Sequence, residues 1–316
     1  MEKDEGPPPV DATAAGAAAA GTAARYLALT VTAPTEAKEA VAALLHDAET
    51  GGVVEEEGPP GLVRLRAYLR EDVAADGRLD DLRRRLAALP SFGLGTAPPT
   101  LIIEAIADEA WTAVWKTHFR TFRVGRRLWV VPTWEQPDLE PGATPIRLDP
   151  GMAFGSGLHP STQLCLRLLE DYLKPGQEIA DIGTGSGILA IAAAKLGAAR
   201  VVAVDHDPVA VEAARANVAQ NQMAERVDVV LGHLLEPVTA PMDLILANLT
   251  ANLLMELAPA IAPRLRPGGA VIASGIAEPR VAEVRDVFGR AGLTIAEEAA
   301  AEEWRALVAG RAPRGG

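Results

Sequence analysis

Cysteine is nearly absent, because Cys165 is the only one among 316 residues. A single cysteine excludes a disulfide within the chain and a zinc site built from several cysteines. It is also typical of the reducing cytoplasm, where we expect the protein to act. The sequence lacks any run that approaches the roughly 18 uncharged apolar residues needed to cross a bilayer. We therefore expect no membrane partner.

Basic residues are too few to balance the acidic ones. The 30 Lys and Arg stand against 42 Asp and Glu, which gives a formal net charge of −12. Proteins bind DNA largely by placing clustered Lys and Arg on its phosphates, so this balance argues against DNA as a partner. At roughly 150 residues a domain, the length predicts about two domains with a sizeable core.

The N-terminal segment has few large apolar side chains. The run from Ala12 to Ala24 contains only Ala, Gly and Thr, and the acidic residues Glu2, Asp4 and Glu5 precede it. A secretory signal has a positively charged start and a strongly apolar middle, and this segment has neither. We expect residues 1–25 to form a flexible tail with no fold of their own.

Residues 26–107 predict a small α+β domain. Alternating apolar residues predict strands, and apolar residues at helical spacing predict helices. The strands are expected at 26–32, 51–57, 62–69 and 101–107, and the helices at 35–48 and 76–89. The order strand, helix, strand, strand, helix, strand is that of a ferredoxin-like fold, which by itself names no function.

Aromatic and basic residues are concentrated just after this domain. Trp111, Trp115 and Phe119 recur every four residues, which predicts one face of a helix, and residues 108–115 are expected to form a linker helix. The stretch from Lys116 to Trp129 contains five basic residues and no acidic one. Two interpretations are open. The aromatic face packs on a neighbouring domain, or the segment contacts ribosomal RNA by stacking and phosphate binding.

The remaining sequence alternates strands and helices. Short apolar runs predict strands at 178–182, 201–205, 227–231, 244–247 and 270–274. Amphipathic segments predict helices at 188–195, 208–220 and 252–265. Near-continuous apolar strands are typical of a parallel, doubly wound sheet that is covered on both faces. Residues 293–298 and 305–309 have no helix between them and predict an antiparallel edge hairpin.

A glycine-rich turn is the first strong functional signal. Gly183, Gly185 and Gly187 follow a predicted strand and open a helix, in the sequence DIGTGSG. Glycines there let the backbone approach a ligand closely. Their spacing differs from the G-x-G-x-x-G typical of dinucleotide binding. Asp205 ends the next strand and can accept hydrogen bonds from ribose hydroxyls, so the pair predicts a nucleoside cofactor and leaves its identity open.

Asn248 follows the fourth strand of this half, in the sequence ANLTA. In a doubly wound sheet the end of that strand borders the same crevice as the glycine turn. The side-chain carbonyl of Asn248 can accept a hydrogen bond from an amine nucleophile and orient its lone pair. The alternative is an ordinary turn residue, for which Asn is a common choice.

The stretch from Asp149 to Thr162 forms a Gly- and Pro-rich loop before a predicted helix. It is either part of the cofactor site or a capping loop with Ser161 or Thr162 as the cap. No Gly-Lys-Ser/Thr follows it, and no G-x-S-x-G occurs in the chain, so a phosphate loop and a hydrolase elbow are not indicated. His159 has no neighbouring His or Cys, and we predict no metal site.

Four stretches together carry a resemblance to a known family. They are residues 111–134, 149–162, 181–207 and 248–251. The chain resembles the ribosomal protein L11 methyltransferase (PrmA-type) family, whose members are class I enzymes that use S-adenosylmethionine. The resemblance implies a Rossmann-like methyltransferase domain over residues 116–316, with a seven-stranded sheet, and a substrate-recognition domain before it. It also implies methylation of lysine side chains and the N-terminal amine of ribosomal protein L11 in the cytoplasm.

The family also implies roles for individual residues. Thr162, Gly183, Asp205 and Asn248 match the cofactor-contacting positions, as does Gly185, with Phe154 and Gly155 in the loop over the cofactor; Asn248 is also the candidate catalytic residue. Two departures occur. Residues 155–157 read Gly-Ser-Gly where the family usually has Gly-Thr-Gly. Residues 232–233 read Gly-His where many class I methyltransferases carry an acid for the adenine amino group.

Three other functions share part of this pattern. A methyltransferase acting on lysines of a different protein would have nearly the same catalytic half. A nicotinamide-dependent oxidoreductase shares the glycine turn and the strand-end acid, but the glycine spacing and the Asn248 stretch count against it. A non-catalytic ribosome-binding module would explain two domains without explaining the cofactor residues.

Overall fold

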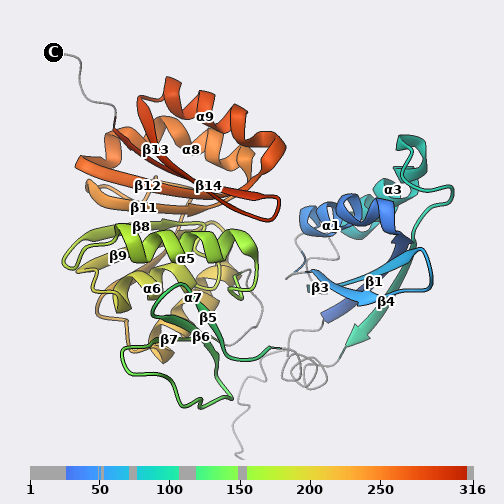
Figure 1. The fold of residues 1–316 in the computed structure, drawn as a ribbon, viewed down its shortest axis with the longest axis horizontal. Helices are drawn as coiled ribbons and strands as arrows, with labels where there is room; N and C mark the ends of the chain where they lie inside the picture. Colours follow the sequence, from blue (N-terminus) through green and yellow to red (C-terminus); the bar gives the residue numbers. More distant parts are fainter. Residues whose placement is uncertain are drawn as a thin grey trace, which may run out of the picture. The chain divides into compact units, whose positions relative to one another are not determined.

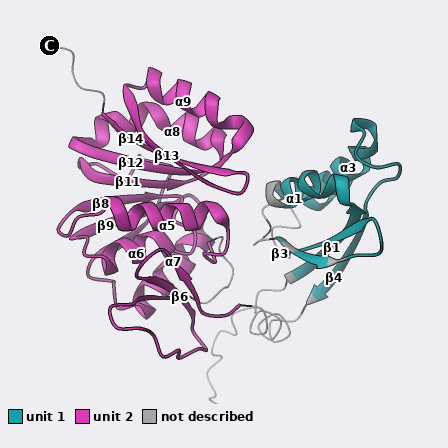
Figure 2. Ribbon diagram, viewed as in Figure 1, with its two compact units in different colours: residues 1–111 teal, residues 112–316 magenta. Residues whose placement is uncertain are grey.

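A computed structural model describes residues 26–48, 50, 53–70, 77–106, 119–148 and 155–311. The chain divides into two compact units, residues 1–111 and 112–316 (Figure 2). One hydrophobic core lies within the first unit and two lie within the second, so each unit has a core of its own residues. The predicted tail (1–25) and linker helix (108–115) fall outside the described residues. Within the described part, no helix is long and apolar enough to span a membrane.

The first unit has the predicted order of elements. They are β1 (Tyr26–Pro34), α1 (Lys38–Asp47), β2 (Val53–Glu57), β3 (Leu62–Arg70), α3 (Leu79–Ala88) and β4 (Thr100–Ile106). The strands pair antiparallel in the order β2-β3-β1-β4. Alternate residues of β1, such as Leu29 and Val31, share a core with Leu45 of α1 and Leu82 of α3. Both helices therefore cover one face of the sheet.

The second unit is built on a seven-stranded sheet. Its strands are β8 (Glu178–Ile182), β9 (Arg200–Asp205), β10 (Val227–Leu231), β11 (Met242–Asn248), β12 (Leu265–Ala277), β13 (Leu293–Ala301) and β14 (Trp304–Arg311). They follow the order β10-β9-β8-β11-β12-β14-β13. The first five are parallel, and β14 runs antiparallel to both β12 and β13. The doubly wound sheet and the edge hairpin are confirmed.

Helices cover both faces of this sheet (Figure 1). They are α5 (Pro160–Tyr172), α6 (Ile188–Lys195), α7 (Pro208–Gln220), α8 (Ala251–Arg264) and α9 (Val281–Arg290). Along β11, Leu244 and Leu246 join the core with α5 and α6, whereas Ile245 and Ala247 join the core with α8 and α9. Because successive residues face opposite layers, all four residues from Leu244 to Ala247 are apolar, and this explains the near-continuous apolar strands.

A three-stranded sheet that the sequence did not predict precedes α5. It consists of β5 (Phe122–Val124), β6 (Leu128–Pro132) and β7 (Thr144–Leu148). The carboxylate of Glu170 on α5 accepts hydrogen bonds from the backbone amides of Arg126, Arg127 and Leu128, at 2.6, 2.7 and 2.9 Å. One buried side chain thus fixes the β5–β6 turn against helix α5 (Pro160–Tyr172).

The aromatic segment is largely part of this unit's core. Phe119 is buried there and lies in no described helix, so the expected helical face does not extend to it. Phe122 and Trp134 pack against the same core. Three of the four described arginines of the segment pair with acids: Arg120 with Glu135 (3.1 Å), Arg123 with Glu140 (3.0 Å) and Arg126 with Asp171 (2.6 Å). These contacts favour packing over an RNA surface. Trp111 and Trp115 fall outside the described residues.

Candidate active site

Three of the predicted site residues stand at the ends of neighbouring parallel strands. Gly183 follows β8, Asp205 is the last residue of β9, and Asn248 is the last residue of β11. The sheet order places β9 and β11 on either side of β8. Between β8 and β11 the chain reverses its direction of winding, and ligands of open α/β sheets bind at this point.

The glycine turn and Asp205 are joined by direct hydrogen bonds. The Gly185 amide donates to Oδ2 of Asp205 (2.9 Å), and the Asp207 amide donates to Oδ1 (3.1 Å). The Asp205 side chain is buried. A carboxylate oxygen has two acceptor positions, so each retains one for a ligand hydroxyl. Gly183 has φ +71°, and a Cβ there would lie 2.4 Å from Cδ2 of Leu249. A side chain at Gly183 would therefore need a positive φ and a shift of the Leu249 side chain.

The loop before α5 contacts the glycine turn. Ser186 donates a hydrogen bond from Oγ to the carbonyl of Gly155 (2.7 Å). Gly155 has φ +111°, and a Cβ on it would lie 2.7 Å from that same hydroxyl oxygen. Ser186, which sequence reasoning did not single out, thus holds the loop at Gly155. Phe154 lies outside the described residues.

Thr162 and Asn248 meet although they are 86 positions apart. The side-chain amide of Asn248 donates from Nδ2 to Oγ1 of Thr162 at 3.0 Å. Because that bond directs Nδ2 toward Thr162, the other amide atom, Oδ1, is left as an acceptor, and it has no hydrogen-bond partner among the described residues. The expected cap at Ser161 or Thr162 is wrong. His159 caps α5, since its side chain accepts from the Ser161 amide, and this leaves the Thr162 hydroxyl to Asn248.

Asp181 is a further member of the site that the sequence reasoning left without a role. It is fully buried beneath the glycine turn. Its Oδ2 accepts from Thr184 Oγ1 (2.6 Å) and from the Ala190 amide (3.1 Å), while its Oδ1 has no partner among the described residues. Burial raises the pKa of this carboxyl to about 7, although the two hydrogen bonds favour the charged form. Its position two residues before Gly183 was the available signal.

The region after β10 differs from that of many class I enzymes, as the sequence indicated. The Gly232 amide donates to the backbone carbonyl of Asp205 (2.8 Å), which keeps this turn beside the strand-end acid. The ring of His233 lies 2.9 Å from Oε1 of Glu256, on α8. His233 therefore pairs with a carboxylate on another element, although residues 232–233 themselves include no acid for the adenine amino group.

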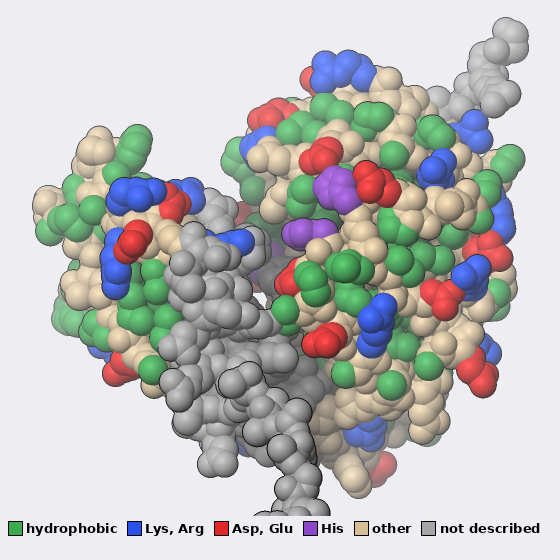
Figure 3. Space-filling view, turned by 180° about the vertical axis from the view of Figure 1, so that it is seen from behind, with side chains coloured by type: hydrophobic (Ala, Val, Ile, Leu, Met, Phe, Trp, Pro, Cys, Tyr) green, Lys and Arg blue, Asp and Glu red, His purple; other side chains and the backbone are tan. Residues whose placement is uncertain are grey.

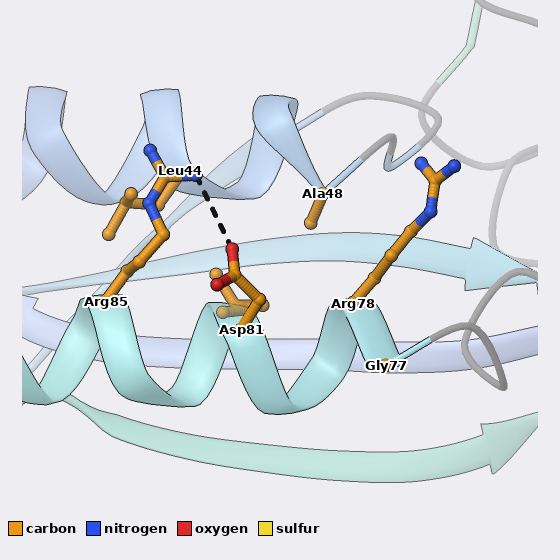
Figure 4. A pocket seen from close by; sticks show the side chains of 7 residues that line it. Leu44, Ala48, Gly77, Arg78, Asp81 and Arg85 are labelled. Atoms are coloured by element: carbon orange, nitrogen blue, oxygen red, sulfur yellow. Dashed lines mark ion pairs between the residues drawn. The ribbon is translucent and has the colours of Figure 1, made fainter.

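A depression lies in the first unit, between α1 and α3 (Figure 4). Leu44, Ala48 and Leu82 give it apolar walls. Arg85 and Asp81 stand on its rim, with Arg85 Nη1 3.9 Å from an Asp81 carboxylate oxygen. None of the predicted cofactor residues lies in this unit, so none of them lines the depression.

The seven-stranded order with its antiparallel edge hairpin, together with the glycine turn at the switch point and the acid on the next strand, fits a class I, S-adenosylmethionine-dependent methyltransferase. The family model for ribosomal protein L11 methyltransferase (PrmA) matches residues 25–312. The chain belongs to this family, and S-adenosylmethionine is its methyl donor.

Individual relatives agree with the family model. The chain is 42% identical over 309 residues to the ribosomal protein L11 methyltransferase of Pelotomaculum thermopropionicum, covering 90% of this chain and 98% of that one. It is 38% identical over 301 residues to that of Exiguobacterium sibiricum, covering 87% and 96%. A crystal structure of ribosomal protein L11 methylase from Lactobacillus delbrueckii subsp. bulgaricus superimposes with a TM-score of 0.56 at 36% identity. It covers 62% of this chain and 100% of that chain.

Proposed function

We propose that the protein transfers methyl groups from S-adenosylmethionine to lysine side chains and the N-terminal amine of ribosomal protein L11. Membership of the family supports this substrate, since relatives that match over nearly their whole length carry that name. The observation that carries the chemistry is the hydrogen bond from Asn248 to Thr162. This bond leaves Oδ1 of Asn248 as an acceptor at the end of β11, beside the switch point. An amine nucleophile can donate a hydrogen bond to it there.

The residues around the glycine turn fit the cofactor. In this proposal Gly183 and Gly185 let the backbone approach it, and Asp205 accepts from both ribose hydroxyls. Two observations support the fit: a Cβ at Gly183 would collide with Leu249, and each Asp205 oxygen makes only one bond to the backbone. Thr162 bonds to Asn248, and Gly155 bonds to Ser186 of the glycine turn. Phe154 stays a predicted contact, because it lies outside the described residues.

Asn248 orients the nucleophile in the proposed reaction. When bound, S-adenosylmethionine supplies an electrophilic methyl group on a sulfonium. A lysine ammonium has a pKa of about 10.4 and loses a proton to water before it can attack. Oδ1 of Asn248 then accepts a hydrogen bond from the neutral amine and aims its lone pair. Orientation of this kind lowers barriers by up to roughly 7–11 kcal/mol in well-ordered systems.

Steady-state kinetics with L11 as substrate tests this role. We expect Asn248→Ala to lower kcat about a hundredfold, because a misplacement of about 1 Å has that effect. The affinity for S-adenosylhomocysteine should fall by less. Asn252→Ala is the matched control, since Asn252 is exposed on the first turn of α8 and bonds to Arg280. A kcat for Asn248→Ala within twofold of the wild type would remove Asn248 from the mechanism.

We also infer that the first unit captures the protein substrate. It has its own core and contains none of the cofactor residues. Its depression between α1 and α3 combines apolar walls with a charged rim, as protein interfaces do. A fragment of residues 112–316, which retains both cores of the second unit, should bind S-adenosylhomocysteine like the full chain and lose methylation of intact L11. Full activity of the fragment on intact L11 would refute the recognition role.

Contact with the ribosome or its RNA stays a prediction. On the face of the second unit seen in Figure 3, acidic and basic side chains are interspersed, and the described arginines of residues 120–126 are paired with acids. These observations favour recognition of L11 itself. A ribosomal substrate and a single buried cysteine support action in the cytoplasm.

A further inference from the structure

A depression on the second unit is bordered by positive charge and lies away from the glycine turn. Residues of β7, the end of α6 and the turn after α7 form it, with a volume of about 420 Å³. α6 begins beside the glycine turn at Ile188 and ends at Lys195. Over those eight residues the helix advances about 10 Å, so the depression is at the opposite end of the helix from the proposed cofactor site.

Lys195 is a half-buried cation that makes no ion pair within the described part of the chain. Among the described residues, no carboxylate or hydrogen-bond acceptor pairs with its ammonium. Burial lowers its pKa, and the nearby guanidinium of Arg147 lowers it further. The Arg147 guanidinium itself donates to a neutral group, the backbone carbonyl of Glu135 (3.2 Å). Neither of these two neighbouring cations forms an ion pair with a described acid.

Arg226 adds a third cation on the same side. Its guanidinium donates to the carbonyl of Ala194 at 3.5 Å and makes no ion pair within the described part of the chain. The one acid that lines the depression, Glu225, is exposed and pairs with none of them. The carbonyls at the end of α6 favour one nearby cation, Lys195. They do not explain why three cations lie on the same side of the unit in a chain whose net charge is −12.

We infer that this depression binds a phosphate-like oxyanion, held by Lys195 and Arg226, with Arg147 adding to the positive field. An arginine fork and a lysine point charge are the usual partners of phosphate oxygens. The volume accommodates inorganic phosphate or one phosphodiester of an RNA strand. Either source would supply the counter-charge that partly buried cations lack.

Amide NMR spectra of the full-length protein, titrated with inorganic phosphate, test the site. We expect saturable shifts at Thr144, Lys195 and Gln222, and affinity at least about tenfold weaker in Lys195→Met and in Arg226→Gln. Lys174→Met is the control, because it removes the same charge from an exposed position outside the depression. Shifts that do not saturate, or that persist unchanged in both variants, would overturn the assignment.

A single-stranded RNA oligonucleotide distinguishes the two sources. If the site takes RNA phosphodiesters, the oligonucleotide shifts the same amides, and inorganic phosphate displaces it. If it takes free phosphate, inorganic phosphate alone produces the saturable shifts. An oligonucleotide that binds equally well to wild type and Lys195→Met, with no phosphate response in either, would contradict the inference.

Discussion

Replacing Asp205 by alanine tests the proposed cofactor site in a way that separates binding from folding. The carboxylate accepts one hydrogen bond from Gly185 and one from Asp207, and each oxygen keeps an acceptor position for a ribose hydroxyl. Hydrogen bonds to a charged group contribute about 1.5–3 kcal/mol. Because 1.4 kcal/mol corresponds to a factor of ten, the dissociation constant for S-adenosylhomocysteine should rise about ten- to hundredfold.

Calorimetric titration with S-adenosylhomocysteine measures this change, and Asp207→Ala is the matched control. Asp207 caps α7 through a bond from the Val209 amide (2.9 Å). Its loss should lower the free energy of unfolding by about 0.5–2 kcal/mol and leave the cofactor affinity within about twofold. The reasoning is refuted if Asp205→Ala binds like the wild type, or if Asp207→Ala weakens binding as much.

Gly183→Ala probes the glycine turn, and Gly176→Ala, in the turn before β8, is its control. Gly183→Ala and Gly176→Ala both force alanine into positive φ, so each should lose about 1–2 kcal/mol of stability in thermal denaturation. Calorimetry should show lost cofactor affinity only for Gly183→Ala, because a Cβ at Gly176 meets open space; equal affinities would contradict this. Asp181→Asn tests the raised pKa of about 7. Since the folded protein holds that proton more tightly than the unfolded chain, wild-type stability falls relative to Asp181→Asn as pH rises from about 4 to 7. Urea denaturation at several pH values checks this, and a constant difference would rule it out.

Much of the second unit could be predicted because its signals are local. Helices α6 and α7 and strands β8 and β10 have the predicted bounds, since each carries a complete hydrophobic period within its own residues. Helix α9 was missed although Val281, Val284 and Phe288 have helical spacing and are buried. Strands β5–β7 are only three to five residues long, and the turn between β5 and β6 depends on Glu170, more than 40 positions away.

The site could be predicted residue by residue but not as a set of contacts. Gly183 and Asp205 follow from a strand-end pattern, and the fold then brings them together. The bond between Asn248 and Thr162 joins residues 86 positions apart, so no local pattern contains it. The His159 cap was missed because Ser, Thr, Asp and Asn are the usual choices there. The role of Asp181 could not be predicted, because its position two residues before Gly183 does not show that its carboxyl is buried.

Mass spectrometry of purified ribosomal protein L11, incubated with the protein and S-adenosylmethionine, tests the central claim most directly. The account predicts added methyl groups on lysine side chains and on the N-terminal amine, and none when Asn248→Ala replaces the wild type over the same short time. An unchanged mass of L11, in a sample where calorimetry shows S-adenosylhomocysteine bound, would contradict the substrate assignment.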